Sequence, residues 1–271
     1  MKLFHYTSRD AALEHILPTG RLRFGRLPRT NDPREFAPVW FSIAGFVGDD
    51  DEPLTTGSPF GLIEEADELL RGSVHVMCLT EDQPSPTGER HGYGNGPRRA
   101  RMWAQYSGNH TGVCLCFDGQ ALVELADRQF RKRQGLSMIH GQVRYAAEGQ
   151  YPPAPTLIQP AAEQNLRAYI DSMVERDPRD WFFVKDWDWS SETEYRFLLR
   201  GDTNDEEFID IRNALEAVIV GPRFHPVYRP GLYKLCEELG VKALEIQWQM
   251  GAPVVVRMLD PGGRRLAGPP V

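Results

Sequence analysis

Four short blocks of the 271-residue chain contain polar residues that could bind a ligand or catalyse a reaction. In chain order they are His5-Tyr6-Thr7, Asn31-Asp32-Pro33 with Glu35, Met102-Trp103-Ala104-Gln105-Tyr106 with Asn109-His110-Thr111-Gly112, and Glu192-Thr193-Glu194-Tyr195-Arg196. The last block offers two carboxylates two residues apart. Paired carboxylates suit a reaction in which positive charge develops on a sugar or a proton must be moved.

Each block also has a purely structural explanation. A histidine such as His5, at the end of a strand, is more often hydrogen-bonded within the protein than to a ligand. Asn31-Asp32-Pro33 is a common turn sequence, and Trp103 and Tyr106 can belong to the buried face of a helix. The glutamates and Arg196 can form a surface row of ion pairs, although such a pair adds only about 0–1 kcal/mol.

Several familiar site motifs are absent from the sequence. It has no Gly-x-Gly-x-x-Gly after a strand, no Walker A loop, no His-Glu-x-x-His and no Gly-x-Ser-x-Gly. The four cysteines have neither disulfide nor zinc spacing, so we expect no metal site. The segment 92–96 is rich in glycine and precedes Arg98, Arg99 and Arg101. It can wrap a phosphate, but its composition favours a flexible basic loop.

Hydrophobic spacing predicts the elements that must position these blocks. Strands are expected at 2–6, 21–24, 73–80, 111–117, 143–146, 194–200, 217–220, 242–248 and 253–259. Helices are expected after a capping box at Thr7 and Asp10, and at 62–71, 101–107, 118–130, 160–176 and 230–239. In the strand 194–200, Glu194 and Arg196 should share one face. Strands and helices mix without a regular alternation, which predicts an α+β fold.

Composition suggests an ordinary globular protein with 41% hydrophobic and 25% charged residues. The net charge of −7 argues mildly against non-specific nucleic-acid binding. No apolar run reaches the length of a signal peptide or a membrane span, so we expect a cytoplasmic protein without a membrane partner. We expect one domain over 1–260, with two lobes divided near 150–160 by a proline-rich segment, and a flexible tail at 261–271.

Together, the four blocks resemble a bacterial family of uncharacterised proteins, domain-of-unknown-function family 2971 (DUF2971). That family's pattern runs His-Tyr-Thr, Asn-Asp-Pro-x-Glu, Met-Trp-x-x-Tyr-x-x-x-His-x-Gly-Val and Trp-x-x-Glu-x-Glu-Tyr-Arg. The chain matches the last part with Trp189, and the resemblance covers about residues 3–225. The glycine-rich loop 84–98 resembles an insertion relative to the family.

A more distant resemblance implies chemistry. A strand with His-x-Thr, then a helix, then Gly20-Arg21-Leu22 is similar to the first motif of NAD-dependent ADP-ribosyltransferases. That resemblance implies split mixed or antiparallel sheets with flanking helices, and NAD as the substrate. It also implies that His5 holds the adenosine ribose, Glu194 holds the nicotinamide-ribose 2′-hydroxyl, and Glu192 acts as general base. A tyrosine should stack on the nicotinamide, and Tyr106, Tyr93 and Tyr145 are the candidates, with Tyr106 ranked first.

The resulting hypothesis is an ADP-ribosyltransferase-like enzyme acting on a protein or nucleic-acid acceptor, with a role as a toxin or in phage defence. The catalytic candidates are Glu194 and Glu192, and the cofactor-binding candidates are His5, Tyr6, Thr7, Asn31, Trp103, Tyr106, His110 and Arg196. The alternatives are a non-catalytic nucleotide- or nucleic-acid-binding module with a surface around Arg98, Arg99 and Arg101, or a structural partner of another protein. The enzyme hypothesis requires His5 and Glu194 to meet in one cleft.

Overall fold

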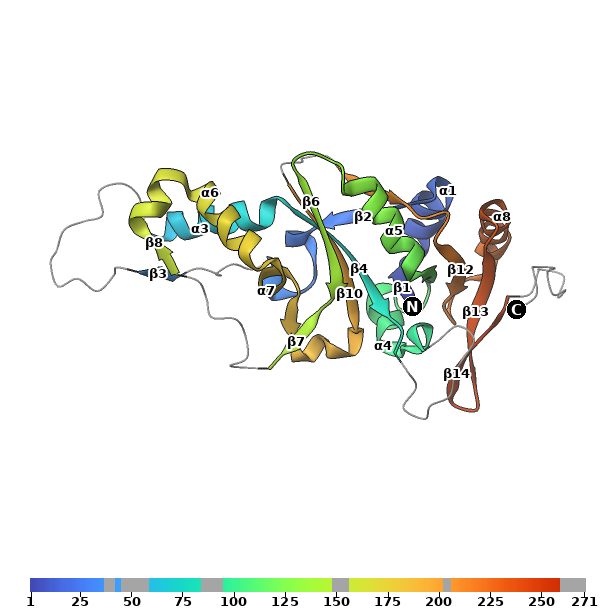
Figure 1. Cartoon of the computed structure of the whole chain (residues 1–271). Helices are drawn as coiled ribbons and strands as arrows, with labels where there is room; N and C mark the ends of the chain where they lie inside the picture. The colour runs from blue at the N-terminus through green and yellow to red at the C-terminus, as the bar shows by residue number, and fades with distance from the viewer. Residues whose placement is uncertain (37–41, 45–58, 84–94, 148–155, 202–205, 259–271) are drawn as a thin grey trace.

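A mixed sheet of ten strands forms the centre of the molecule in the computed structural model, which describes residues 1–36, 42–44, 59–83, 95–147, 156–201 and 206–258 (Figure 1). Its strands are β1 (Lys2–Thr7), β2 (Arg21–Arg26), β4 (Val74–Glu81), β5 (Val113–Asp118), β6 (Leu136–Gln142), β10 (Glu194–Gly201), β11 (Glu207–Asp210), β12 (Leu215–Val220), β13 (Lys242–Gln249) and β14 (Ala252–Arg257). The α+β prediction is confirmed.

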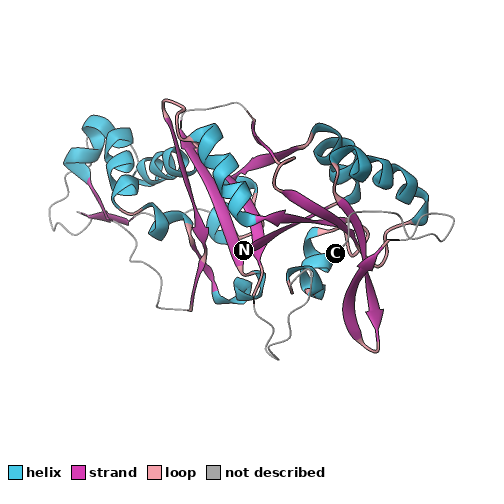
Figure 2. Cartoon of the chain, turned by 45° about the vertical axis from the view of Figure 1, so that its right-hand side comes forward, coloured by secondary structure: helices cyan, strands magenta, loops and turns pink. Residues whose placement is uncertain are grey.

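Helices flank this sheet (Figure 2), and two short strand pairs are separate from it. The α-helices are α1 (Leu17–Thr19), α2 (Pro33–Phe36), α3 (Pro59–Gly72), α4 (Ala100–Tyr106), α5 (Gly119–Phe130), α6 (Gln159–Arg176), α7 (Pro178–Phe182) and α8 (Arg229–Leu239). A π-helix, η1 (Ala11–Ile16), precedes α1, and the short 3₁₀ turns are η2 (Leu27–Arg29), η3 (Gly96–Arg98), η4 (Trp187–Glu192) and η5 (Pro226–Tyr228). The parallel pairs are β3 (Ser42–Ala44) with β8 (Thr156–Ile158), and β7 (Arg144–Ala146) with β9 (Val184–Asp186).

The strand order is β11-β2-β4-β1-β5-β12-β13-β14, and β10 lies between β4 and β6. Every pairing in this sheet is antiparallel except that of β12 with β13. Strand β10 pairs with β4 along almost its whole length, from Glu194 opposite Thr80 to Arg200 opposite Val74. Strand β10 therefore occupies one edge of β4.

The other edge of β4 is shared between two strands that diverge from each other. Strand β1 meets it only at Glu81 and Thr80, and β2 meets it only at Val76 and His75. Between these contacts, residues 77–79 of β4 have no strand partner on that side among the described residues. The sheet therefore opens between β1 and β2, and this opening positions the site described below.

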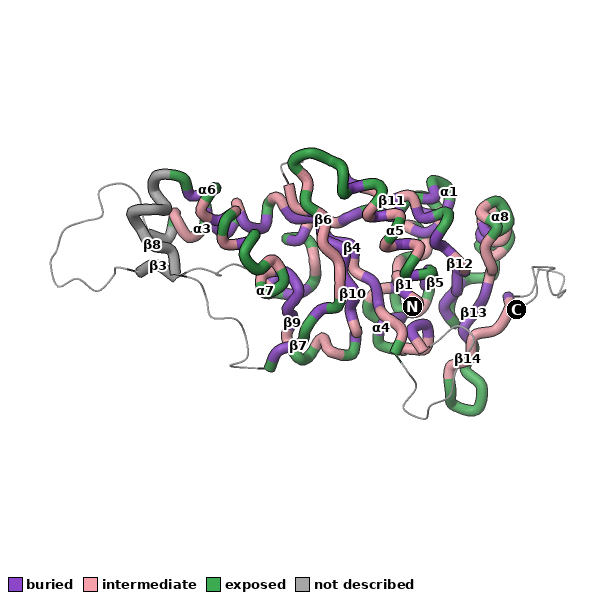
Figure 3. Tube along the Cα trace, in the orientation of Figure 1, coloured by how far each residue is buried: buried purple, intermediate pink, exposed green. Residues whose placement is uncertain are grey.

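Buried side chains form separate clusters on the two faces of the sheet, and Figure 3 shows the buried positions concentrated along the central strands. Tyr195, Phe197 and Leu199 pack with α5 and α8 in the largest cluster, whereas Leu198 packs with residues of α3, α6 and α7 in another. This separation confirms the face assignment predicted for β10. It buries the Glu194 and Arg196 side chains on the second face.

Two local predictions need correction. The capping box is wrong, because Thr7 ends β1 and the Ser8 hydroxyl accepts the Ala11 N–H instead, at 3.2 Å. The strand predicted at 143–146 is only β7, and β6 just before it was not predicted. Strand β6 lacks a regular apolar alternation and forms through pairing with all of β10 except Glu194. The predicted lobe boundary falls largely on 148–155, and the loop 84–94 and the tail 261–271 also lie outside the described residues.

Candidate functional site

A cavity of about 1040 Å³ occupies the opening between β1 and β2. Its walls come from β1, η1, α1, β2, η2, β4, α4, β9, η4, β10 and β11. Seven of the residues predicted from sequence line it: His5, Tyr6, Thr7, Asn31, Tyr106, Glu192 and Glu194. The structure therefore brings the first, second, third and fourth sequence blocks to one cavity, whose volume suits a cofactor-sized ligand.

His5 is held at the opening by the free edge of β4. Its Nδ1 lies 3.0 Å from the backbone carbonyl oxygen of Cys78, within the segment that has no strand partner there. A carbonyl oxygen only accepts hydrogen bonds, so Nδ1 carries the proton in the neutral ring. Burial lowers the pKa of His5, although the bond to Cys78 opposes that change, so the ring is neutral at pH 7. Nε2 is then an acceptor, and no described residue donates to it.

The strand registers place His5 and Glu194 on opposite faces of the sheet. Directly paired residues of antiparallel strands share a face. Glu194 pairs with Thr80, and Thr80 pairs with Phe4, so Phe4 and Tyr6 share the face of Glu194. His5, between them, belongs to the other face. His5 and Glu194 line one cavity, as the enzyme hypothesis requires, but they do so from opposite faces of the sheet.

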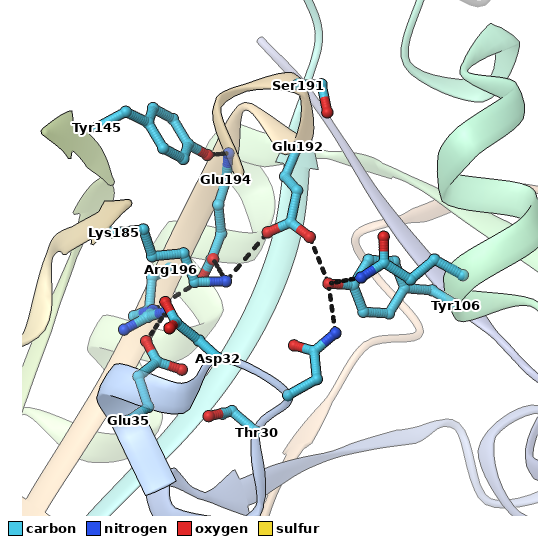
Figure 4. Close-up of polar contacts among 12 residues, drawn as sticks. Thr30, Asp32, Glu35, Tyr106, Tyr145, Lys185, Ser191, Glu192, Glu194 and Arg196 are labelled. Atoms are coloured by element: carbon cyan, nitrogen blue, oxygen red, sulfur yellow. Dashed lines mark hydrogen bonds and ion pairs between the residues drawn. The ribbon is translucent and has the colours of Figure 1, made fainter. Parts of the chain in front are cut away.

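A buried cluster of carboxylates and cations forms one wall, as Figure 4 shows. Lys185 Nζ lies 3.0 Å from a Glu192 oxygen and 2.7 Å from a Glu194 oxygen. Arg196 Nε donates to the other Glu194 oxygen at 2.7 Å, and Arg196 Nη2 lies 2.5 Å from Glu35. Burial favours protonation of Glu194, but Arg196 and then Lys185 outweigh it and hold the pKa of Glu194 far below its usual range.

Glu192 faces the cavity from the other side of Lys185. The Tyr106 hydroxyl donates to Glu192 Oε1, and Asn31 Nδ2 donates to the Tyr106 oxygen at 2.9 Å. Burial, followed by the charge of Glu192, raises the pKa of Tyr106, which therefore stays protonated and able to donate. Three of the sequence blocks are joined by this chain of hydrogen bonds. Glu194 is held by two cations, whereas Glu192 shares one cation and accepts from a neutral hydroxyl.

The turn between the two glutamates has an unusual backbone. Thr193 has φ of 44° and ψ of 52°, a left-handed conformation that is rare for a β-branched residue. Two hydrogen bonds fix it: the Thr193 hydroxyl donates to the Glu81 carbonyl at 3.0 Å, and the Glu194 N–H donates to the Tyr145 hydroxyl at 2.7 Å. Strain of this kind is kept where the surrounding structure requires it, often at functional sites. Here it turns both carboxylates toward Lys185.

Arginines from α4 and the residue before it hold η4 in place. Arg99 donates to the Ser191 carbonyl at 2.5 Å, and Arg101 donates to the Ser191 hydroxyl at 2.9 Å and to the Asp188 carbonyl at 3.0 Å. The sequence suggested phosphate or nucleic-acid binding for these two residues. The structure uses both to fix the turn that precedes Glu192.

Three predicted cofactor-binding residues lie behind the cavity wall. Trp103 is buried, its indole N–H donates to the Pro97 carbonyl at 2.7 Å, and its ring meets the Tyr6 ring edge-on at 5.2 Å. His110 has φ of 73° and its backbone N–H donates to the Trp103 carbonyl at 3.0 Å. Arg196 is buried beneath Glu194. None of these three lines the cavity. Trp103 and Arg196 contact the lining residues Tyr6 and Glu194, whereas His110 contacts Trp103.

Sequence reasoning missed the cationic residues of the cavity. They are Arg21, Arg23, Arg26, Arg29 and Lys185. Three carboxylates also line it, those of Glu192, Glu194 and Glu206, so five cations face three anions, giving a formal charge of +2 in a chain of net charge −7. The alternation of arginines in β2 was a usable signal, since it placed two arginines on one face. Lys185 had no signal, because its partners are set by the tertiary fold.

The described residues contain no group of three or more histidine, cysteine, aspartate or glutamate side chains placed to hold a metal ion. Among the described segments, no helix has both the length and the apolar character needed to cross a bilayer.

Comparison with known proteins gives one family. Residues 102–197 match the model of the family described as "Protein of unknown function (DUF2971)". The matched segment runs from α4 into β10 and contains Tyr106, Lys185, Glu192 and Glu194. The match supports the resemblance to this family that was expected from the sequence blocks. No curated protein and no solved structure matches the chain significantly.

Proposed function

We propose that the cavity binds NAD and that the protein transfers ADP-ribose from it to a protein or nucleic-acid acceptor. One observation carries this proposal: His5, Tyr106, Glu192 and Glu194 line a single cavity at an opening in the sheet. Their order along the chain is that of the ADP-ribosyltransferase motifs they resemble. The same resemblance implies a split sheet, which the opening between β1 and β2 matches. We propose that the fold, too, is ADP-ribosyltransferase-like.

The charge distribution of the cavity suits this ligand. Four arginines of the lining come from β2 and η2, whereas Glu192 and Glu194 come from η4 and β10. Arg21 and Arg29 form no ion pair with any described residue, whereas Arg23 pairs with Glu206 at 2.9 Å. NAD has an anionic diphosphate and a cationic nicotinamide ring. Guanidinium groups are strong phosphate ligands, and carboxylates favour the cation, so each part of NAD has a matching wall.

The proposed reaction breaks the bond between the nicotinamide nitrogen and C1′ of the ribose. The bonding electron pair leaves with the nicotinamide, which becomes neutral, and positive charge develops on the ribose. A fixed carboxylate stabilises this charge best where water is excluded. The acceptor's nucleophilic atom then bonds to C1′, and its proton passes to a carboxylate acting as general base.

The contacts divide these roles between the two glutamates. Glu194 is almost wholly neutralised by Arg196 and Lys185, whereas Glu192 shares one cation and so retains more negative charge toward the cavity. We therefore assign Glu192 to the ribose and the acceptor proton, and Glu194 to fixing Glu192 through Lys185. Tyr106 orients Glu192 from the cavity side. The acceptor Nε2 of His5 suits a ribose hydroxyl.

A second candidate function is nucleotide binding without cleavage. The ion pairs favour this function, because Lys185 contacts both glutamates and Arg196 also contacts Glu194. A carboxylate that is paired with a cation offers less negative charge to a reaction. Calorimetric titration with NAD and with ADP-ribose separates the possibilities. Under the main proposal both bind, and NAD is consumed with release of nicotinamide. Under the second, both bind and NAD stays intact.

A pair of charge-reversal variants tests the basic wall directly. Arg21→Glu and Arg29→Glu remove the unpaired cations and should each weaken ADP-ribose binding by about 10-fold or more, with a smaller salt dependence than wild type. Arg257→Glu, outside the cavity lining, is the control. Unchanged affinity in both cavity variants would show that the anionic part of the ligand lies elsewhere.

A further inference from the structure

Lys185 lies at the centre of the carboxylate cluster, although no sequence motif marks it. It comes from β9, its side chain is 4% exposed, and its ammonium contacts Glu192 at 3.0 Å and Glu194 at 2.7 Å. Burying an ammonium is costly unless carboxylates offset the lost hydration. Here one ammonium forms ion pairs with two carboxylates, one from the residue before Thr193 and one from the residue after it.

Titratable and charged groups from several elements interact electrostatically with this ammonium. They are Glu192 from η4, Glu194 and Arg196 from β10, Glu35 from α2, Asp32 before it, Cys78 from β4, Tyr145 from β7 and Tyr106 from α4. Trp189 covers it with a ring whose centroid lies 5.3 Å from Nζ. Burial acts to lower the pKa of Lys185, but Glu194 above all, with Glu35 and Glu192, raises it despite Arg196. The side chain is therefore an ammonium at neutral pH.

Two carboxylates held this close repel each other, and in the absence of a cation one of them would take up a proton or move away. Arg196 cannot prevent this alone, because it contacts Glu194 and Glu35 but has no contact with Glu192. We infer that Lys185 is a positioning residue that keeps Glu192 and Glu194 side by side on the cavity wall. Its link to NAD turnover rests on the proposed function, whereas its effect on the carboxylates does not.

The test compares Lys185→Met, which keeps the length but removes the charge, with Lys185→Arg, which keeps the charge. The protein is labelled with carbon-13 at the glutamate carboxyl carbons, and the two resonances are assigned with Glu192→Gln and Glu194→Gln. In Lys185→Met, a carboxyl of the pair should titrate about one pH unit or more above its wild-type position. Lys185→Arg should restore most of the wild-type titration. The acid limb of nicotinamide release should move in the same direction as the carboxyl titration.

A purely structural role gives a different pattern. Lys185→Met would then lower the unfolding temperature while the carboxyl titration stayed at its wild-type position, and this result would overturn the inference. Should Lys185→Met not fold, Lys185→Gln makes the same comparison with a neutral hydrogen-bond donor in place. A wild-type protein that never releases nicotinamide contradicts the proposed function only, since the carboxyl titration still decides the role of Lys185.

Discussion

The imidazole Nδ1 of His5 lies 3.0 Å from the carbonyl oxygen of Cys78, on the stretch of β4 that neither β1 nor β2 covers. This contact replaces a missing ladder hydrogen bond and fixes the ring at the cavity. It also explains why a histidine stands in β1, because it combines a donor for β4 with an acceptor for a ligand.

Replacing His5 by alanine should therefore weaken ADP-ribose binding by about 5- to 30-fold, which corresponds to the loss of one or two hydrogen bonds. The Cys78 carbonyl would also lose its partner, so the unfolding temperature should fall slightly. Binding is measured by calorimetry. His225→Ala, at an exposed turn outside the cavity lining, is the control and should bind normally. Wild-type affinity in His5→Ala would exclude His5 from the ligand contacts.

Glu194 should make the stability of the protein depend on pH. Its folded pKa is depressed by Arg196 and Lys185, which outweigh burial, so its contribution is complete above the unfolded value of about 4.3 and is lost as the pH falls toward the folded value. Glu194→Gln leaves two buried cations poorly paired and should cost about 3–5 kcal/mol at pH 7. The difference from wild type should shrink by about 1.4 kcal/mol for each pH unit below about 4.3.

Urea unfolding at pH 7 and at several values below 4.3 measures this difference. Glu238→Gln removes an exposed i,i+4 pair with Lys234 and should change stability by no more than about 0.5 kcal/mol. A difference between wild type and Glu194→Gln that stays constant across the whole range would show that Glu194 is not held ionised by its neighbours.

Cys78 provides a chemical probe of the cavity. It lines the cavity and is partly exposed, whereas Cys114, Cys116 and Cys236 are buried. Burial, with a further contribution from Glu194, raises the pKa of the Cys78 thiol, so iodoacetamide should modify it slowly at pH 7 and faster at pH 9. ADP-ribose at ten times its dissociation constant should slow the modification about tenfold.

Mass spectrometry locates the modified residue, and Cys78→Ser, which should remain unmodified, is the control. A modification rate that saturating ADP-ribose does not change would place the bound ligand outside this cavity.

The sequence was sufficient for the elements whose patterns are local. The regular alternation of Glu194 to Arg200 placed Arg196 on the correct face. The helix expected at 118–130 is α5, which Asp118 caps by accepting the Gln120 and Ala121 N–H groups. The order of the four blocks correctly indicated that they meet. Strand β6 was missed because pairing with β10, rather than its own pattern, holds it in place.

The detailed contacts of the site were beyond the sequence for a physical reason. The ion pair of Arg196 with Glu35 joins residues that are distant in the chain, and Lys185 is recognisable only by the two carboxylates that surround it. The division of His5 and Glu194 between two faces depends on where β1 and β2 leave β4. Tertiary packing decides such registers, and the hydrophobic pattern of a single segment does not predict them.

The most direct test measures, by chromatography, how fast wild-type protein and Glu192→Gln release nicotinamide from NAD when candidate protein and nucleic-acid acceptors are present. We expect the wild type to release nicotinamide and Glu192→Gln to do so at least about 100-fold more slowly, with ADP-ribose binding retained. Glu216→Gln, outside the cavity lining, should release nicotinamide at the wild-type rate. Equal release by wild type and Glu192→Gln would contradict the assignment of Glu192. If NAD binds but is not cleaved in the presence of any acceptor, the proposed transferase activity is wrong.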